Sequence, residues 1–286
     1  MKLITFFKDG KKRLGALVEA GIIDFHNFFP GVCMKEFINQ KEDLWQKAQD
    51  IVKTEKNSAF PVSSVKILAP ISNPGKIIGI GLNYIDHCRE QNVPVPKYPV
   101  VFAKFSSSLL NPYDAITWSQ DLTQQVDCEA ELAVIMGKKA FRVDVAQACE
   151  HIFGYTILND VSARDLQFRD KQWVRAKSLD TFCPLGPAVV TQDEISDPQN
   201  LAIRSLVNGE IRQDSSTSQM IFSVAELVSY LSHSFSLEPG DIIATGTPHG
   251  VGVFRKPQVF LQQGDRVVIE IEKIGQLENP VVVLER

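Results

Sequence analysis

Short apolar runs separated by glycine turns make up the first part of the chain. Three of them are rich in β-branched and aromatic residues and predict short strands: KLITFF, RLGALV and GIIDF. Between Met34 and Val52, apolar residues recur at i, i+3 and i+4 spacing, which predicts one helix with a single apolar face. The polar stretch KTEKNSAFPVSS follows. We therefore predict a small β-rich N-terminal domain over residues 1–66 and a main domain over residues 67–286.

The sequence of the main domain predicts mostly strands. Its β-branched or alternating runs, bounded by Gly, Pro, Asn and Asp, cover residues 99–105, 128–137, 154–160, 186–191, 201–209, 241–246, 265–272 and 280–285. The apolar run KIIGIG is a further strand, which ends at Gly81. Asn208-Gly209 is a strong signal for a tight hairpin.

Few helices interrupt these strands. Ser223 and Glu226 stand at capping-box spacing before an apolar helical face, and Asp144 with Gln147 predicts a second, short helix. The regular βαβ alternation of a doubly wound sheet is missing. The pattern therefore predicts a mixed β fold of the α+β class.

Composition and charge exclude several kinds of protein. The chain has 286 residues, of which 44% are hydrophobic and 22% charged, so it can form a substantial core. Its formal charge of −4 comes from interspersed signs, which argues against nucleic acid as a partner. No stretch of about 18 apolar residues predicts a membrane span.

Cysteine usage bears on the compartment. The five cysteines are widely spaced and form no CxxC pair: Cys33, Cys88, Cys128, Cys149 and Cys183. We expect reduced thiols that serve as small packing residues. With no secretory signal pattern in the first residues, the expectation is a cytoplasmic protein.

Three acidic residues lie in or at the end of predicted strands, where their side chains could come close together. Glu129 and Glu131 are two apart in a predicted strand, so their side chains share a face. Asp160 ends another strand. Such carboxylates can belong to a solvated strand face, or they can bind Mg²⁺ or Mn²⁺, which prefer oxygen ligands. Three coordination positions would then remain for a bidentate substrate and one water.

A histidine and a lysine are candidate catalytic residues. His87 and Glu90 are neighbours at i and i+3 of a predicted helix, so Glu90 can orient the imidazole as a general base. A partly exposed histidine on a short helix is the alternative. Lys177 lies in a segment rich in Lys and Arg and by itself is equally compatible with the surface. The turn TGTPHG lacks the lysine of a phosphate-binding loop, so a nucleotide site is not expected.

Taken in order, six segments resemble the motifs of the fumarylacetoacetate hydrolase family. They are GLNYIDHCRE, CEAELAVIMGKKA, GYTILNDVSARDLQ, WVRAKSLDTFCPLGP, VNGEIRQ and GDIIATGTPHGVG, within residues 70–286. The resemblance implies mixed β-sheets rolled around a metal site, usually in a homodimer.

The resemblance also assigns roles to residues of this chain. It implies that Glu129, Glu131 and Asp160 bind Mg²⁺ or Mn²⁺, that His87 and Glu90 form a water-activating dyad on a mobile lid, and that Lys177 lies near a developing enolate. It places four more residues along the substrate pocket: Arg164, Gln167, Lys104 and Thr247.

Two departures concern the substrate. Leu82 stands where many family members have arginine, and the further aspartate ligand of fumarylacetoacetate-cleaving members has no match. Fumarylacetoacetate is therefore not the expected substrate. The expected activity is hydrolysis of an acylpyruvate such as fumarylpyruvate, through an enolate that the metal stabilises. Oxaloacetate decarboxylation or keto–enol tautomerisation is the alternative, and a non-catalytic metabolite-binding protein comes after both.

Overall fold

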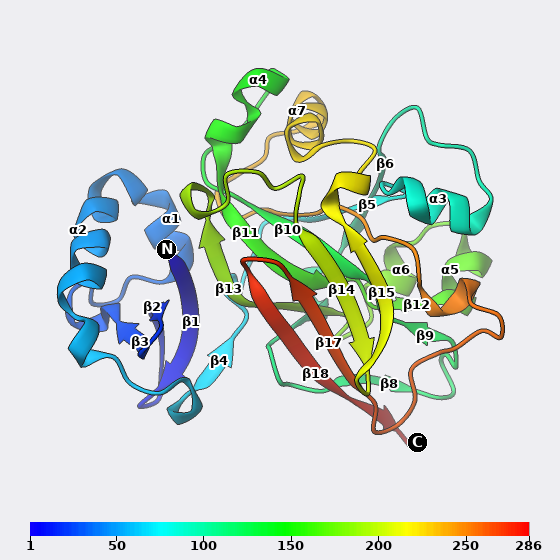
Figure 1. The fold of residues 1–286 in the computed structure, drawn as a ribbon, viewed down its shortest axis with the longest axis horizontal. Coiled ribbons are helices and arrows are strands. Elements are labelled where there is room, and N and C mark those ends of the chain that lie inside the picture. Colours follow the sequence, from blue (N-terminus) through cyan, green and yellow to red (C-terminus); the bar gives the residue numbers. More distant parts are fainter. Residues whose placement is uncertain (286) are drawn as a thin grey trace.

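An eleven-stranded mixed sheet runs through the N-terminal and main parts of the chain (Figure 1). The computed structural model describes residues 1–285. In sheet order the strands are β3 (Gly21–Asp24), β2 (Lys11–Val18), β1 (Lys2–Lys8), β13 (Cys183–Thr191), β11 (Ile152–Asn159), β10 (Ala130–Met136), β16 (Ile242–Ala244), β5 (Ile77–Gly81) and β6 (Val100–Lys104), with β4 (Lys66–Leu68) on β1 and β7 (Leu109–Leu110) on β13. The domain boundary at residue 66 falls at the start of β4 and stays a prediction.

Two further sheets complete the β structure. The five-stranded sheet has the order β15 (Glu210–Ser216), β14 (Ala202–Val207), β17 (Arg266–Ile271), β18 (Gly275–Leu284) and β8 (Ile116–Ser119). A small ribbon pairs β12 (Ser162–Ala163) with β9 (Val126–Asp127). As predicted, Asn208 and Gly209 form the tight turn between β14 and β15, both with positive φ.

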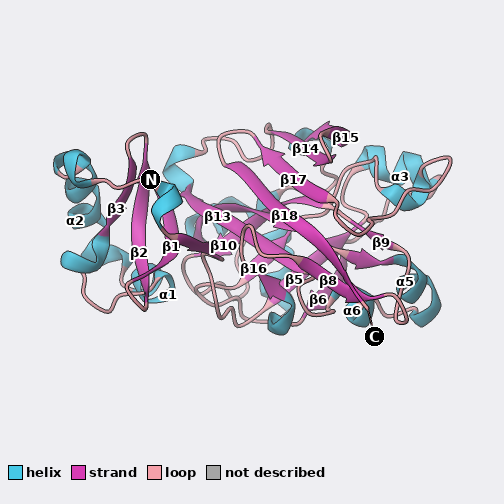
Figure 2. Ribbon diagram, turned by 90° about the horizontal axis from the view of Figure 1, so that it is seen from below, coloured by secondary structure: helices cyan, strands magenta, loops and turns pink. Residues whose placement is uncertain are grey.

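The described helices are short and lie around the sheets. They are α1 (Met34–Asn39), α2 (Lys41–Thr54), α3 (Ile85–Gln91), α4 (Val145–Ala148), α5 (Arg164–Asp170), α6 (Val174–Lys177) and α7 (Val224–Ser234). Figures 1 and 2 place α3 and α5 at the opposite end of the molecule from β1, β2 and β3. No described helix has the length and apolar character needed to cross a membrane.

Strand β10 is buried on both faces, which explains its apolar sequence. Leu132 and Val134 point into the core shared with the five-stranded sheet, whereas Ala133 and Ile135 join the core under α1 and α2. The strand is thereby held rigidly between two packed layers, and so are the acidic residues at its beginning.

The capping prediction for α7 is confirmed, and the one for α4 holds only in part. Ser223 and Glu226 form the reciprocal capping box. Asp144 does precede α4, but its side chain makes no capping hydrogen bond.

The prediction of one helix from Met34 to Val52 is wrong, because the chain breaks at Gln40 between α1 and α2. Residues 39–43 are all polar, so one helical turn has no apolar residue to keep both halves on the core. The break lets each half bury its own face, Phe37 from α1 and Ile51 from α2.

Candidate active site

Glu129, Glu131 and Asp160 meet at one end of the large sheet. Strands β10 and β11 are antiparallel, with Ala130 opposite Asn159, so the start of one lies beside the end of the other. Glu129 comes directly before β10, Glu131 is its second residue, and Asp160 directly follows β11. Ligand oxygens of all three residues lie within 4.8 Å of one another. The carboxylates are 4%, 1% and 0% exposed, so the solvated-face alternative does not hold.

Lys177, the last residue of α6, lies among these carboxylates. Its Nζ is 2.6 Å from Oε2 of Glu129 and 2.7 Å from Oδ2 of Asp160. Burial lowers the pKa of the ammonium, but the two carboxylates outweigh burial and raise it. Lys177 is therefore a buried, charged group and not a surface lysine.

Arg164 completes the charge pattern around Glu129. Its Nη1 lies 2.7 Å from Oε1 of that residue. Burial raises the pKa of Glu129, but the positive charges of Lys177 and Arg164 outweigh it and bring the pKa down to about 2. Glu129 therefore stays ionised over the working range of an enzyme.

Glu131 has a different environment. Its Oε2 accepts a hydrogen bond from the backbone N–H of Gly246 at 2.9 Å, and it takes part in no ion pair with the described residues. Burial raises its pKa well above the ordinary value, and the charges of Asp160 and Glu129 add to the rise. A bound cation would relieve this repulsion, so the three-oxygen donor set fits Mg²⁺ or Mn²⁺.

Helix α3 carries the predicted dyad to the same cavity. Nδ1 of His87 lies 3.0 Å from Oε2 of Glu90. Because the carboxylate only accepts, Nδ1 carries the proton and Nε2 holds the lone pair. The Nε2 atom accepts a hydrogen bond from the amide of Gln91 at 2.7 Å. His87 is only 5% exposed, so the exposed-histidine alternative does not hold either.

Contacts with the rest of the chain hold α3 from two sides. Oε1 of Glu90 accepts the backbone N–H of Gly250 at 2.8 Å. Oδ2 of Asp86 accepts the hydroxyl of Ser215 at 2.5 Å and lies 3.0 Å from Nδ1 of His249. These hydrogen bonds hold α3 against the rest of the described structure.

A cavity of about 160 Å³ brings most of the predicted residues together. Its lining includes His87, Gln91, Glu129, Glu131, Asp160, Arg164, Gln167, Lys177 and Thr247. Lys104 lies behind Asp160 instead of along this lining, because its ammonium donates to Oδ1 of that residue at 2.6 Å and also to the carbonyl of Lys177. The lining also includes apolar residues, among them Leu82 and Trp173.

Gln91 and Asp127 belong to the site and its surroundings without having been predicted from the sequence. Gln91 follows His87 at i+4, so helical spacing alone could have indicated its contact. Asp127 bonds to the side chain of Arg164, which is 37 residues away, and no local signal connects the two.

Several proteins of known name or structure are similar to this chain. "Oxaloacetate tautomerase fahd2, mitochondrial" of Xenopus laevis is 48% identical over 290 residues, covering 99% of this chain and 90% of that protein. This relative belongs to the fumarylacetoacetate hydrolase domain-containing protein 2 group, which the segments DHCREQNVPVPKYPVVFAKF and GVGVFRKPQVFLQQGD also indicate.

Two solved structures share the fold over nearly the whole chain. A fumarylacetoacetate hydrolase from Exiguobacterium antarcticum has a TM-score of 0.85 and 38% identity, covering 99% of this chain and 100% of that one. Maleylpyruvate hydrolase from Sphingobium sp. SYK-6, in complex with manganese(II) and pyruvate, has a TM-score of 0.83 and 29% identity, with both chains fully covered. The predicted fold of mixed sheets around the site is confirmed. Both neighbours are named as enzymes, which agrees with the prediction that the family is one of enzymes.

The expectation of a cytoplasmic protein is wrong, since the Xenopus relative is named as a mitochondrial protein. All five cysteines are free, as expected, although Cys33 and Cys149 are exposed and do not pack in the core. Free thiols separate a reducing compartment from an oxidising one, but they do not separate one reducing compartment from another.

The family profile described as "Fumarylacetoacetate (FAA) hydrolase C-terminal" matches residues 76–282. This range includes the carboxylates, the lysine and the dyad that the fold brings together. The chain belongs to the fumarylacetoacetate hydrolase family.

Proposed function

We propose that this protein is a Mg²⁺- or Mn²⁺-dependent enzyme that interconverts the keto and enol forms of oxaloacetate. One observation carries the proposal: three buried carboxylates, a buried lysine and His87, whose Nδ1 is held by Glu90, line a single cavity. The name of the Xenopus relative supports oxaloacetate as the substrate and tautomerisation as the reaction. This assignment replaces acylpyruvate hydrolysis as the first choice.

Glu129, Glu131 and Asp160 would hold the cation, and their oxygens suit Mg²⁺ and Mn²⁺ alike. When bound, the cation would polarise the keto group of a 2-oxo acid and offset the negative charge of its enolate. The buried ammonium of Lys177 supplies a second positive charge beside the same oxygen.

His87 is the proton carrier in this proposal. With Nδ1–H held by Glu90, Nε2 accepts the proton that leaves C3 of oxaloacetate as the C3–H bond breaks. The same proton then passes from Nε2 to the enolate oxygen, which gives the enol. No water takes part and no carbon–carbon bond breaks. The Gln91 amide that donates to Nε2 has to move aside first.

The size of the cavity favours a short substrate. Its volume of about 160 Å³ lies below the roughly 300–1,000 Å³ typical of pockets for larger ligands. Leu82 and Trp173 add apolar surface to its lining. In this proposal the apolar surface keeps water away from the enolate and favours proton return over hydrolysis.

Acylpyruvate hydrolysis is the second candidate, because the same His87 could activate a water and the Sphingobium neighbour is a maleylpyruvate hydrolase. Decarboxylation of oxaloacetate would need no attacking water: the C3–C4 bond breaks, CO₂ leaves, and the resulting pyruvate enolate takes up a proton at C3. An assay of oxaloacetate, acetylpyruvate and fumarylpyruvate with Mg²⁺ and Mn²⁺ separates these outcomes. We expect enol–keto exchange of oxaloacetate to be the fastest reaction, and faster cleavage of an acylpyruvate would contradict the proposal. A homodimer remains the proposed assembly.

A further inference from the structure

Asp127 lies one layer behind the wall of the active site. It ends β9 and is 3% exposed. Its Oδ1 accepts the backbone N–H groups of Cys128 at 3.0 Å and Gly252 at 2.9 Å. Its Oδ2 accepts the N–H of Val253 at 3.1 Å and two guanidinium N–H groups of Arg164, at 3.0 and 2.9 Å. Five donors saturate this carboxylate, so it has no lone pair left for a cation or a substrate.

On one side, Asp127 positions the carboxylate centre. Nε and Nη2 of Arg164 bond to Asp127, which leaves Nη1 directed at Oε1 of Glu129, 2.7 Å away. Nη1 also donates to Gln167. The rigid guanidinium therefore transmits the position of Asp127 to a residue that would bind the cation.

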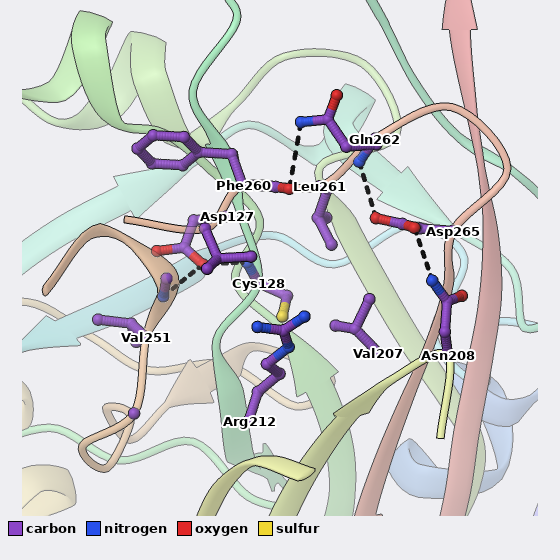
Figure 3. Close-up of a pocket in the computed structure, with 13 residues that line it drawn as sticks. Asp127, Cys128, Val207, Asn208, Arg212, Val251, Phe260, Leu261, Gln262 and Asp265 are labelled. Carbon is purple, nitrogen blue, oxygen red and sulfur yellow. Dashed lines mark hydrogen bonds between the residues drawn. The ribbon is translucent and has the colours of Figure 1, made fainter. Parts of the chain in front are cut away.

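On the other side, Asp127 positions the loop under the dyad. Figure 3 shows its carboxylate beside the loop that carries Val251. Two residues of this loop donate to Asp127, and Gly250, just before them, donates to Oε1 of Glu90. Phe254, at the end of the same loop, places its ring edge-on to His87 with the centroids 6.0 Å apart.

The loop needs glycine at both of its close approaches. Gly250 has φ +102°, and a Cβ there would lie 2.2 Å from the carbonyl oxygen of Arg212. A Cβ on Gly252 would lie 1.8 Å from the carbonyl oxygen of Val259 and 2.9 Å from Oδ1 of Asp127. The backbone thus comes close enough for Asp127 to hold it directly.

We propose that Asp127 is a positioning residue that fixes the carboxylate centre and the His87–Glu90 pair relative to each other. Through Arg164 it sets the orientation of Glu129. Through residues 250–254, which contact His87 and Glu90, it sets the position of that pair. The inference rests on the proposed function in taking His87 as the group that moves the proton. Beyond that function, one buried carboxylate outside the cavity controls both the affinity for the cation and the order of α3.

Asp127→Asn tests this with little change in volume. The amide replaces one acceptor by a donor, so either Arg164 or the loop loses its partner. We expect the Kd for Mn²⁺, measured by calorimetry, to rise about 10- to 100-fold. We expect kcat for oxaloacetate to fall about 10²-fold. Hydrogen exchange of the α3 amides should become faster.

Asp241→Asn is the matched control. Asp241 is also buried. Its carboxylate accepts the backbone N–H groups of Lys76 and Glu238 and the side-chain ammonium of Lys76. Unlike Asp127, it makes no contact with a residue that lines the active-site cavity through these bonds. Its loss should lower the melting temperature and leave α3 exchange and the Mn²⁺ Kd unchanged. The proposal is overturned if Asp127→Asn, like this control, leaves either the Mn²⁺ Kd or the α3 exchange unchanged.

A double-mutant cycle separates positioning from general damage. The cycle is measured at saturating Mn²⁺, so that a loss of cation affinity does not enter kcat. If Asp127 acts on kcat through the dyad, Asp127→Asn should then lower kcat of a Glu90→Gln protein by no more than about 2-fold. Losses that multiply under these conditions overturn the proposal. If Asp127→Asn does not fold, Phe254→Leu replaces it in the test. This variant removes the ring that contacts His87, so hydrogen exchange of the α3 amides must become faster. Should wild-type protein fail to act on oxaloacetate, the proposed function fails, while the Mn²⁺ titration and the exchange still decide the role of Asp127.

Discussion

Nδ1 of His87 lies 3.0 Å from Oε2 of Glu90, one helical turn further along α3. The other carboxylate oxygen of Glu90 accepts the backbone N–H of Gly250, so the pair is fixed to the body of the protein as well as to its own helix. An imidazole held in this way keeps Nδ1–H and presents Nε2 as its basic atom. This geometry is the one that a histidine needs to act as a general base, as we propose for His87.

The first prediction concerns this histidine. His87→Ala should lower kcat for enol–keto exchange of oxaloacetate by roughly 10²–10⁴, the usual range for a lost general base. Mn²⁺ affinity should be unchanged, because His87 is not among the predicted ligands. His233→Ala, an exposed histidine on α7, is the control. A kcat within a factor of two of wild type would show that another group moves the proton.

Glu131→Gln should separate metal binding from folding. Burial and two neighbouring negative charges raise the pKa of Glu131, so a neutral amide there should not lower the melting temperature of the metal-free protein. Excess Mn²⁺ should stabilise wild-type protein, by about 2.7 kcal/mol at 100 times Kd, and should not stabilise the variant. Equal shifts in thermal melts of both proteins would place the cation elsewhere.

Lys177→Met should affect both stability and rate. Removing the ammonium leaves Glu129 and Asp160 without their shared partner, which should lower the free energy of unfolding by about 3–5 kcal/mol. It should also lower kcat by about 10²–10³, the effect of losing one group that stabilises an oxyanion. Denaturant titration and steady-state assays measure the two effects. Lys177→Arg, which keeps the charge, should retain most of the stability, and a kcat that Lys177→Met leaves intact would contradict this role.

Leu82→Arg should change substrate preference. Leu82 lines the cavity and already has φ +53°, so the new side chain meets no backbone strain that leucine does not. A guanidinium there can bind the distal carboxylate of fumarylpyruvate, and a charged hydrogen bond of about 1.5–3 kcal/mol corresponds to a roughly 10- to 100-fold lower KM. Acetylpyruvate, which has no distal carboxylate, should show no such gain. Equal changes for both substrates would mean that Leu82 does not face the distal group.

Much of the site could be predicted because its residues follow local rules. Glu129 and Glu131 share a face through strand alternation, and His87 and Glu90 meet through helical spacing. Asp160 joins them because β10 and β11 pair with Ala130 opposite Asn159, and only the fold supplies that register.

Other features depended on tertiary contacts that leave no local pattern. Asp127 contacts the loop at Gly252, 125 residues away, and an isolated aspartate between two apolar residues gives no sign of this. The break at Gln40 arises because each half of the helix packs on its own part of the core, which periodicity alone does not reveal. The cellular compartment depends on no residue of the active site.

We propose that the buried carboxylates and His87 together catalyse a cation-dependent tautomerisation of oxaloacetate. The decisive test follows the conversion of enol-oxaloacetate to the keto form by its ultraviolet absorbance, after chelation and then after addition of Mg²⁺ or Mn²⁺. We expect that chelated protein does not exceed the uncatalysed rate, and that the added cation restores turnover in wild type but not in Glu131→Gln. Full activity in the chelated protein would contradict it.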